Sequence, residues 1–308
     1  MKVALVTGGA GFIGSHLCDR LIADGWRVAC VDNFVTGAKD NVVHLADNDA
    51  FELIEHDICE PLDLGVEPSV VWHLASLASP EAYFAKPIET LEVGSVGTKN
   101  MLDLARGSGA RFVFTSTSEV YGDPEVTPQP ESYRGNVSPI GRRAVYDESK
   151  RYAEALTMAY YRDGLDVRIA RVFNTYGPRL QPGDGRAVSN FIRQALAGEP
   201  VTVYGDGSQT RSFCYVDDMV AGLLALSTND EIGPVNLGNP DERTIRDVAE
   251  LVIERTKSSS QIELRPLPED DPRRRCPDIS LARTRLSWSP TVALEDGIDR
   301  TIQWFRDS

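Results

Sequence analysis

Two side chains one helical turn apart, Tyr146 and Lys150, have the types and the spacing to remove a proton from an alcohol. The chain from 146 to 159 has helical spacing and contains no breaker, so both side chains lie on one face of a predicted helix. An ammonium group near a phenol favours the ionised phenol, which would make Tyr146 a proton acceptor near neutral pH. A Tyr-x-x-x-Lys pattern on its own more often consists of exposed residues without a catalytic role, so the surrounding sequence decides the interpretation.

The context begins with a strand that ends in hydroxyl groups. An apolar run at 112–114 is followed by Thr115-Ser-Thr-Ser-Glu119, which predicts a buried strand with an exposed polar end. Thr117, Ser118 and Glu119 stand at that end and are candidates for a site beside Tyr146. For Glu119 the structural alternative is a carboxylate that caps a turn.

A second context is a glycine-rich turn at the start of the chain. The apolar run 2–7 precedes Gly8-Gly-Ala-Gly-Phe-Ile-Gly14, and an amphipathic stretch follows at 15–23. Gly8, Gly11 and Gly14 are spaced every third residue, so backbone amides at a helix start can approach a pyrophosphate. A strand, a glycine turn and a helix in this order indicate a dinucleotide site.

Asp32 follows the next predicted strand, at 26–31. A carboxylate at that place accepts hydrogen bonds from the adenosine ribose and repels a 2'-phosphate, which favours NAD over NADP. The alternative is that Asp32 only caps a turn.

Strands and helices then alternate along the chain. Strands are expected at 51–54, 70–74, from 111 and at 167–172, with a long helix at 88–105. This order predicts an α/β fold of the Rossmann type, a doubly wound parallel sheet with ligands at the carboxyl ends of its strands. The residues expected to line that crevice are Asp32, Asp57, Ala75, Ser76, Thr117, Ser118, Glu119 and Asn174.

The second part of the chain is richer in turns and polar loops. We expect a cofactor domain at 1–175, to which later segments can return, and a smaller C-terminal substrate lobe at 176–308. Arg211 and the run 273–275 stand out in a chain of net charge −14 and suit the capture of phosphate or carboxylate. For the run, a solvated basic cluster is the alternative.

The composition excludes several classes of partner. A charge of −14 argues against nucleic acid and anionic membranes, and no apolar run reaches the length of a membrane span. The chain begins with a strand rather than a signal peptide. Five cysteines without Cys-x-x-Cys spacing indicate reduced thiols in the cytoplasm, and four histidines show no metal-ligand spacing. No metal site is expected.

Together these motifs resemble the extended short-chain dehydrogenase/reductases that act on nucleotide sugars, and within them the UDP-glucuronate decarboxylase family. The resemblance covers nearly the whole chain. It is carried by the glycine turn with Asp32 and by the runs Thr115-Ser-Thr-Ser-Glu-Val-Tyr-Gly-Asp-Pro124, Tyr146-Asp-Glu-Ser-Lys-Arg151, Asp184-Gly-Arg-Ala-Val-Ser-Asn-Phe191, Ser208-Gln-Thr-Arg-Ser-Phe-Cys-Tyr-Val216 and Asp271-Pro-Arg-Arg-Arg-Cys-Pro-Asp278.

The resemblance implies a reaction in which NAD is reduced and then reoxidised. Tyr146 would take the proton of the sugar C4 hydroxyl with help from Lys150 and Thr117, and the resulting 4-ketone would let the C5 carboxylate leave as carbon dioxide. Glu119 would position that carboxylate or, as a protonated acid, return a proton to C5, and Arg211 would orient the acid group. Ser118 stands where related dehydratases carry an acid, which disfavours dehydration. The product would be UDP-xylose.

The resemblance also implies the binding residues and a homodimer built through helices at 88–105 and 146–161. Around NAD it places Gly8, Gly11, Phe12, Ile13, Gly14, Asp32, Asn33, Asp57, Ile58, Ala75, Tyr146, Lys150, Thr175 and Arg186. Around the UDP-sugar it places Tyr83, Asn174, Asn190, Tyr204, Gln209, Arg211 and Arg275, with Arg275 on the pyrophosphate.

Two residues depart from the family pattern. Gly94 stands where an Asn is typical, and Glu81 adds an acid to the Ser-Pro-x-x-Tyr loop. Both predict a looser hold on the 4-keto intermediate, some of which would be released. The alternatives are a UDP-uronate or UDP-hexose 4-epimerase and, from another class, an NAD-binding scaffold without turnover.

Overall fold

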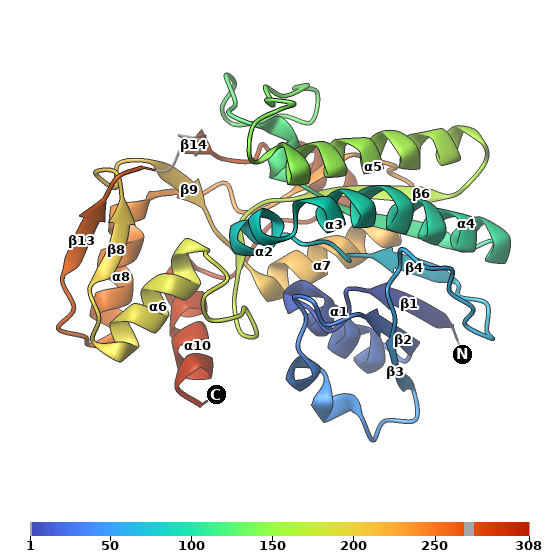
Figure 1. The fold of residues 1–308 in the computed structure, drawn as a ribbon, viewed down its shortest axis with the longest axis horizontal. Helices are drawn as coiled ribbons and strands as arrows, with labels where there is room; N and C mark the ends of the chain where they lie inside the picture. The colour runs from blue at the N-terminus through green and yellow to red at the C-terminus, as the bar shows by residue number, and fades with distance from the viewer. Residues whose placement is uncertain (1, 268–273, 308) are drawn as a thin grey trace.

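A seven-stranded parallel sheet forms the centre of the chain in a computed structural model, which describes residues 2–267 and 274–307 (Figure 1). In spatial order the strands are β11 (Val235–Leu237), β6 (Val167–Val172), β5 (Arg111–Thr117), β4 (Val70–His73), β1 (Val3–Thr7), β2 (Arg27–Asp32) and β3 (Phe51–Glu55). Every neighbouring pair is parallel. The predicted doubly wound α/β fold is therefore confirmed.

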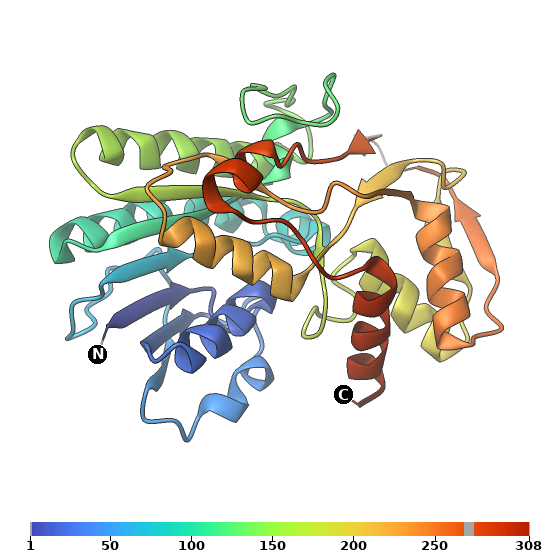
Figure 2. The ribbon, with the colours of Figure 1, turned by 180° about the vertical axis from the view of Figure 1, so that it is seen from behind.

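Both faces of the sheet are covered by helices, because side chains along each strand alternate between two apolar cores. In β1, Ala4 and Val6 belong to one core and Leu5 to the other. On the first face α1 (Phe12–Ala23) packs against α7 (Val216–Ser227), which Figure 2 shows side by side. On the second face lie α3 (Pro87–Glu92), α4 (Thr98–Ser108) and α5 (Ala144–Arg162).

The long helix predicted at 88–105 is interrupted. A π-helical turn, Val93–Gly97, separates α3 from α4. Gly94 lies in this turn against α5, where an added Cβ would be 2.6 Å from the Cβ of Ser149. Ser149 Oγ donates to the carbonyl of Tyr146 at 2.7 Å. The π-turn thus brings α3 close to the part of α5 that carries Tyr146.

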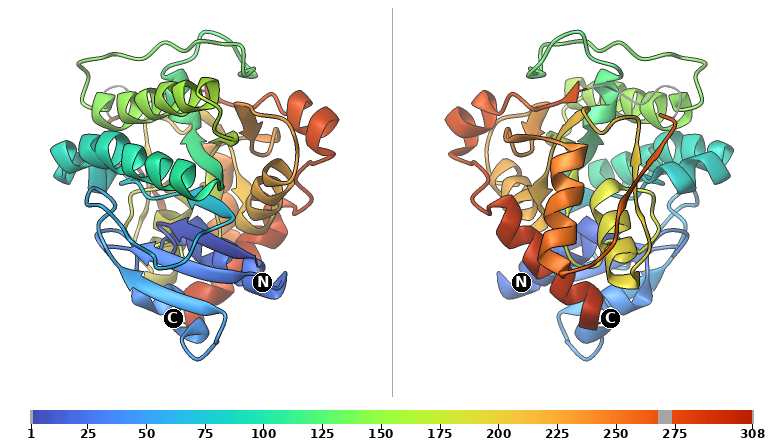
Figure 3. Two further views of the ribbon diagram at one scale, coloured as in Figure 1. Left: turned by 90° about the vertical axis from the view of Figure 1, so that its right-hand side faces the viewer. Right: turned by 90° about the vertical axis from the view of Figure 1, so that its left-hand side faces the viewer.

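The smaller lobe is built around three short sheets. Its strands and helices are β7 (Thr175–Tyr176), α6 (Ala187–Ala197), β8 (Val201–Tyr204), β9 (Thr210–Ser212), β10 (Cys214–Tyr215), β12 (Glu242–Thr244), α8 (Ile245–Thr256), β13 (Ile262–Arg265), β14 (Arg274–Arg275) and α10 (Leu294–Asp307). The helix α9 (Ser280–Leu286) instead packs against β11 and α7 at the large sheet. In sequence, β11 comes between these elements, yet it completes the large sheet. The two end-on views of Figure 3 show the helical layers on either side of the sheet.

Four short elements complete the described chain: α2 (Pro80–Ala85), and the 3-10 turns Lys39–Asn41, Val43–Leu45 and Ser118–Tyr121. No helix in residues 2–267 and 274–307 combines the length and apolarity that a membrane crossing requires.

Candidate active site

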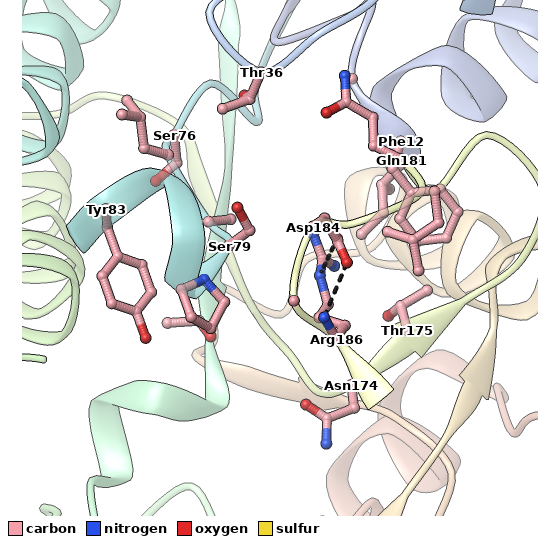
Figure 4. A pocket seen from close by; sticks show the side chains of 18 of the residues that line it. Phe12, Thr36, Ser76, Ser79, Tyr83, Asn174, Thr175, Gln181, Asp184 and Arg186 are labelled. Atoms are coloured by element: carbon pink, nitrogen blue, oxygen red, sulfur yellow. Dashed lines mark hydrogen bonds and ion pairs between the residues drawn. The ribbon is translucent and has the colours of Figure 1, made fainter. Parts of the chain in front are cut away.

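A cavity of about 660 Å³ opens where the carboxyl ends of the large sheet face the smaller lobe. In Figure 4 Tyr83 and Ser79 lie on one side of it, and Asn174, Thr175 and Arg186 lie on the other. Among the described candidate site residues, all line this cavity except Asp57 and Arg274, and Arg274 pairs with Glu242 instead. Asp57 instead accepts a hydrogen bond from Asn33 Nδ2 at 3.1 Å, and so supports a residue that does line it.

The glycine turn brings bare backbone to one end of the cavity. Gly8 has φ +69°, and an added Cβ would lie 2.8 Å from the amide nitrogen of Ala75. At Gly14 an added Cβ would lie 2.1 Å from the carbonyl oxygen of Gly8. The turn can therefore fold tightly only with glycine at these positions. The start of α1 next to it presents free amides, which suits a pyrophosphate.

Asp32 both holds the turn and faces the cavity. Its two carboxylate oxygens accept from the amides of Ala10 at 3.0 Å and Phe34 at 2.8 Å. Burial raises the pKa of this carboxyl, against which the backbone hydrogen bonds act. The turn-capping role and the ribose-binding role are compatible, because each carboxylate oxygen accepts more than one hydrogen bond.

Tyr146 and Lys150 lie next to each other on α5, and both are buried. Lys150 Nζ donates to the carbonyl of Thr115 at 2.9 Å and lies 6.0 Å from the centre of the Tyr146 ring. Burial raises the pKa of Tyr146, although a hydrogen bond with Thr117 lowers it. Burial also lowers the pKa of Lys150 to about 7. The expected lowering of the Tyr146 pKa is thus wrong, because desolvation by burial is the largest contribution and raises it.

Glu119 is held between two arginines. It lies in the 3-10 turn after β5, where Thr117 Oγ1 accepts from its amide at 3.2 Å. Arg143 Nη2 donates to Glu119 Oε2 at 2.5 Å, and Arg275 donates to both carboxylate oxygens. Burial opposes ionisation, but the two guanidinium groups outweigh it and hold the pKa of Glu119 at about 2.

One expectation about this group needs correction. Glu119 was expected to be able to act as a protonated acid, but between two guanidinium groups it is ionised. Arg275 lines the cavity and pairs with Glu119, and its assignment to the pyrophosphate stays a prediction. It comes from β14, which pairs with β9 so that Arg275 lies beside Arg211. Arg273, the first arginine of that run, lies outside the described residues.

Sequence reasoning missed Arg143. This arginine ends an irregular loop and precedes α5, so no periodicity marked it. The available signal was its position three residues before Tyr146, which places both side chains on the same side of the helix start. Tyr83 was found, and its ring stacks on that of Tyr146 with centroids 5.3 Å apart. Its buried hydroxyl has no hydrogen-bond partner among the residues that the structure describes.

A loop of the smaller lobe approaches the Ser-Pro-x-x-Tyr segment across the cavity. Asp184 Oδ2 pairs with Arg186 Nε at 2.7 Å, which Figure 4 marks with dashes. Between them stands Gly185, at φ +86°, where an added Cβ would lie 3.2 Å from Glu81 Cγ. Glu81, one of the two residues that depart from the family pattern, thus lies against the loop that carries Arg186.

Comparison with known proteins gives consistent results. The model of the NAD dependent epimerase/dehydratase family matches residues 4–238. The chain is 55% identical over 304 residues to UDP-glucuronic acid decarboxylase 1 of Arabidopsis thaliana, covering 98% of this chain and 69% of that protein. It is 54% identical over 305 residues to UDP-glucuronic acid decarboxylase 1 of Danio rerio, covering 99% and 72%.

Solved structures show the same fold. A UDP-glucose 4-epimerase of Thermotoga maritima with UDP-glucose has a TM-score of 0.92 at 31% identity, covering 99% of both chains. A UDP-glucuronic acid 4-epimerase of Bacillus cereus in complex with UDP-glucuronic acid and NAD has a TM-score of 0.89 at 30% identity, with the same coverage.

Proposed function

The chain belongs to the NAD dependent epimerase/dehydratase family, and within it we propose that this protein is a UDP-glucuronic acid decarboxylase that works with NAD. It converts UDP-glucuronate through a UDP-4-keto intermediate to UDP-xylose and carbon dioxide. Besides the similarity to decarboxylases, one observation carries the proposal. Two arginines and a glutamate meet beside the catalytic tyrosine, where an acidic sugar needs cationic partners.

The cavity fits NAD at the end formed by the glycine turn and Asp32. When bound, NAD supplies the acceptor for the hydride from C4 and returns that hydride at the end. Tyr146 has to be the phenolate to take the proton of the C4 hydroxyl, a form that the positive charges of Lys150 and of a bound oxidised nicotinamide ring would favour against burial. Thr117, its hydrogen-bond partner, is placed to orient the same hydroxyl. Lys150 supplies positive charge beneath the tyrosine, close to the strand end.

The oxidation makes the decarboxylation possible. A ketone at C4 lies β to the carboxylate carbon, so the C5–C6 bond breaks with its electron pair delocalised into the ketone. Arg143 and Arg275 can exchange a contact with Glu119 for one with the sugar carboxylate, because guanidinium groups bind either carboxylate in the same way. The same guanidinium groups also stabilise the negative charge of the enolate that forms when the C5–C6 bond breaks.

The test is to incubate the protein with UDP-glucuronate and NAD, and to measure carbon dioxide together with the separated nucleotide sugars. We expect UDP-xylose and carbon dioxide, with Tyr146→Phe inactive. Tyr152→Phe is the matched control, because Tyr152 lies on the same helix and is half exposed. Formation of UDP-galacturonate without carbon dioxide would establish the 4-epimerase instead. Unchanged function in Tyr146→Phe would favour the scaffold.

We also propose that part of the UDP-4-keto-pentose is released before reduction. Gly94 brings no side chain to the contact with α5, and Glu81 adds a carboxylate to the cavity wall. The separation of the nucleotide sugars described above also tests this release. If UDP-xylose forms and no keto sugar is found at any time, the proposed release is wrong.

Two further proposals concern assembly and location. A homodimer through α3 and α5 is supported by exposed apolar side chains there, Ile88, Leu91, Tyr152 and Tyr161. Sedimentation of the protein and of Leu91→Asp tests it, and a monomeric parent would contradict it. A cytoplasmic location is supported by five cysteines that are all free, and cell fractionation tests it.

A further inference from the structure

A buried ion pair joins three of the elements that surround the cavity. Glu154 of α5 and Arg171 of β6 have side chains that are only 14% and 12% exposed. Arg171 donates to both carboxylate oxygens, from Nε at 2.8 Å and from Nη2 at 2.7 Å. Ser116 Oγ of β5 donates to Glu154 Oε1 at 2.6 Å. Ser116 and Arg171 are paired neighbours on the two strands, so Glu154 holds α5 to both strands at one level.

Stability alone does not explain this pair. Burying two charges costs desolvation that a hydrophobic pair of similar size avoids. The site offers another explanation, because Lys150 precedes Glu154 by one turn on the same face of α5. Lys150 Nζ donates to the carbonyl of Thr115 at 2.9 Å, and Thr115 directly precedes Ser116. A cation and an anion of α5 thus bind successive residues at the end of β5.

Arg171 extends the contact to the turn that carries Glu119. Its Nη1 donates to Tyr121 Oη at 2.9 Å, and Tyr121 Oη donates to Asn236 Oδ1 of β11 at 2.7 Å. Tyr121 is the last residue of the 3-10 turn that includes Glu119. The helix that takes the proton of the C4 hydroxyl and the turn that faces the sugar carboxylate are therefore fixed to the same ion pair.

The charge of Glu154 also acts on Lys150. Two charges four residues apart on a helix, both largely shielded from water, interact with little screening. Burial lowers the pKa of Lys150, and the carboxylate of Glu154 opposes this effect. His73 of β4 interacts with Lys150 as well, but burial lowers its pKa to about 3, so it is neutral. Tyr146 of α5 and the carbonyl of Thr115 also face the ammonium group.

We propose that Glu154 and Arg171 are positioning residues for the reaction in the cavity. Glu154 fixes α5 against β5 and β6, and its charge keeps Lys150 an ammonium group where the phenolate of Tyr146 has to form. Arg171 connects this arrangement to the turn with Glu119. Both act through other residues, because neither is among the described residues that line the cavity. The effect on turnover rests on the proposed function, whereas the effect on the charge of Lys150 does not.

The charge of Lys150 is measured by NMR titration of protein labelled with carbon-13 at the lysine Cε, with the signal assigned by Lys150→Met. Glu154→Gln removes the anion and leaves Arg171 as an unpaired cation, so Lys150 should lose its proton at a pH lower by roughly one to two units. Arg171→Met leaves the anion uncompensated and should move the titration to higher pH. The double variant should lie near the wild type. Both single variants break the same contact, so only the charge predicts shifts of opposite sign.

Glu148→Gln is the matched control for the titration. Glu148 lies on the same helix two residues before Lys150, so it points to another side, where it pairs with Arg151. Its removal should leave the titration unchanged. Turnover is measured as carbon dioxide released from UDP-glucuronate. Glu154→Asp keeps the charge but is one methylene too short to hold both partners, so kcat should fall more than roughly tenfold while KM and the Lys150 titration stay close to those of the wild type.

Two results would overturn the proposal. One is a Lys150 titration that is the same in Glu154→Gln as in the wild type, or that shifts in one direction in both single variants. The other is an unchanged kcat in Glu154→Asp. If a single variant does not fold, the double variant decides, since it leaves no buried charge unpaired: it should be slow with a near-normal titration, and wild-type turnover would overturn the proposal. The expected shifts together with no carbon dioxide from the wild type would refute the proposed function and leave the effect on Lys150 standing.

Discussion

The contact between Gly94 and Ser149 predicts that even one methyl group is too large for the packing of the π-turn Val93–Gly97 against α5. Carbon atoms normally approach to about 3.5–4.0 Å, so the 2.6 Å that an alanine Cβ would have from the Cβ of Ser149 is roughly 1 Å too short. The backbone carbonyl of Ser149 lies on the same side, at 3.2 Å, so a rotation of the Ser149 side chain does not relieve the overlap. Gly94→Ala should force the two helices apart.

The size of the effect follows from two opposing contributions. Overpacking a well-filled interface costs roughly 1–3 kcal/mol. Alanine in place of glycine inside a helix contributes up to about 1 kcal/mol in the other direction. Gly107 provides the matched control, because it lies within α4 and an added Cβ there meets nothing within 4 Å. The difference in free energy of unfolding between Gly94→Ala and Gly107→Ala therefore isolates the overlap, at roughly 1–3 kcal/mol.

Urea unfolding of both variants measures this difference, and the double variant Gly94→Ala/Ser149→Gly tests its cause. Removing the Ser149 side chain should recover a large part of the lost stability. Gly94→Ala should also lower the activity. Ser149 Oγ donates a hydrogen bond to the carbonyl of Tyr146, so a displacement of Ser149 displaces Tyr146 as well. Equal stability of Gly94→Ala and Gly107→Ala would refute the reasoning.

Three other variants test the site. Glu119→Gln leaves two buried guanidinium groups uncompensated and should destabilise the protein by about 3 kcal/mol at pH 7. Because the folded pKa is about 2 and the usual value is 4.5, ionised Glu119 stabilises the wild type above pH 4.5, and this contribution is lost as the pH falls towards 2. The difference seen in urea unfolding should therefore shrink at low pH. For Lys150 the folded pKa is about 7 against 10.5, so the unfolded chain binds more protons between these values and stability rises with pH. Lys150→Met should abolish activity, raise stability at pH 6 and remove that rise, and an unchanged pH profile would contradict the burial of the ammonium. Gly14→Ala, with its Cβ 2.1 Å from Gly8 O, should weaken NAD binding more than roughly tenfold in a fluorescence titration, and Gly11→Ala, at 3.0 Å, should weaken it less.

The parts of the site that were predictable depend on local sequence. The strand before Gly8, the helix after Gly14 and the carboxylate at Asp32 follow one another within a single β-α-β unit, where order and spacing are informative. Tyr146 and Lys150 were predictable for the same reason, since one helix fixes their separation. The parallel order of the strands then brought their polar ends together in one cavity.

The remaining parts depend on contacts between distant segments. Arg275 reaches Glu119 because β14 pairs with β9 in a separate small sheet, and a strand of two residues leaves no periodic pattern. Arg143 ends a loop without regular structure. The pKa of Tyr146 was misjudged because the sequence shows the neighbouring Lys150 but not the depth of burial, which is the larger contribution.

The position of the two arginines that pair with Glu119, Arg143 and Arg275, also affects the association rate of the substrate. They are the attractive charges for an anionic sugar, yet they are enclosed in the cavity of a chain whose net charge is −14. An approaching nucleotide sugar meets the repulsive field of the whole molecule first, and at 0.1 M salt that field is screened beyond about 10 Å. Added salt should therefore speed association, while dissociation, set by the enclosed contacts, changes little.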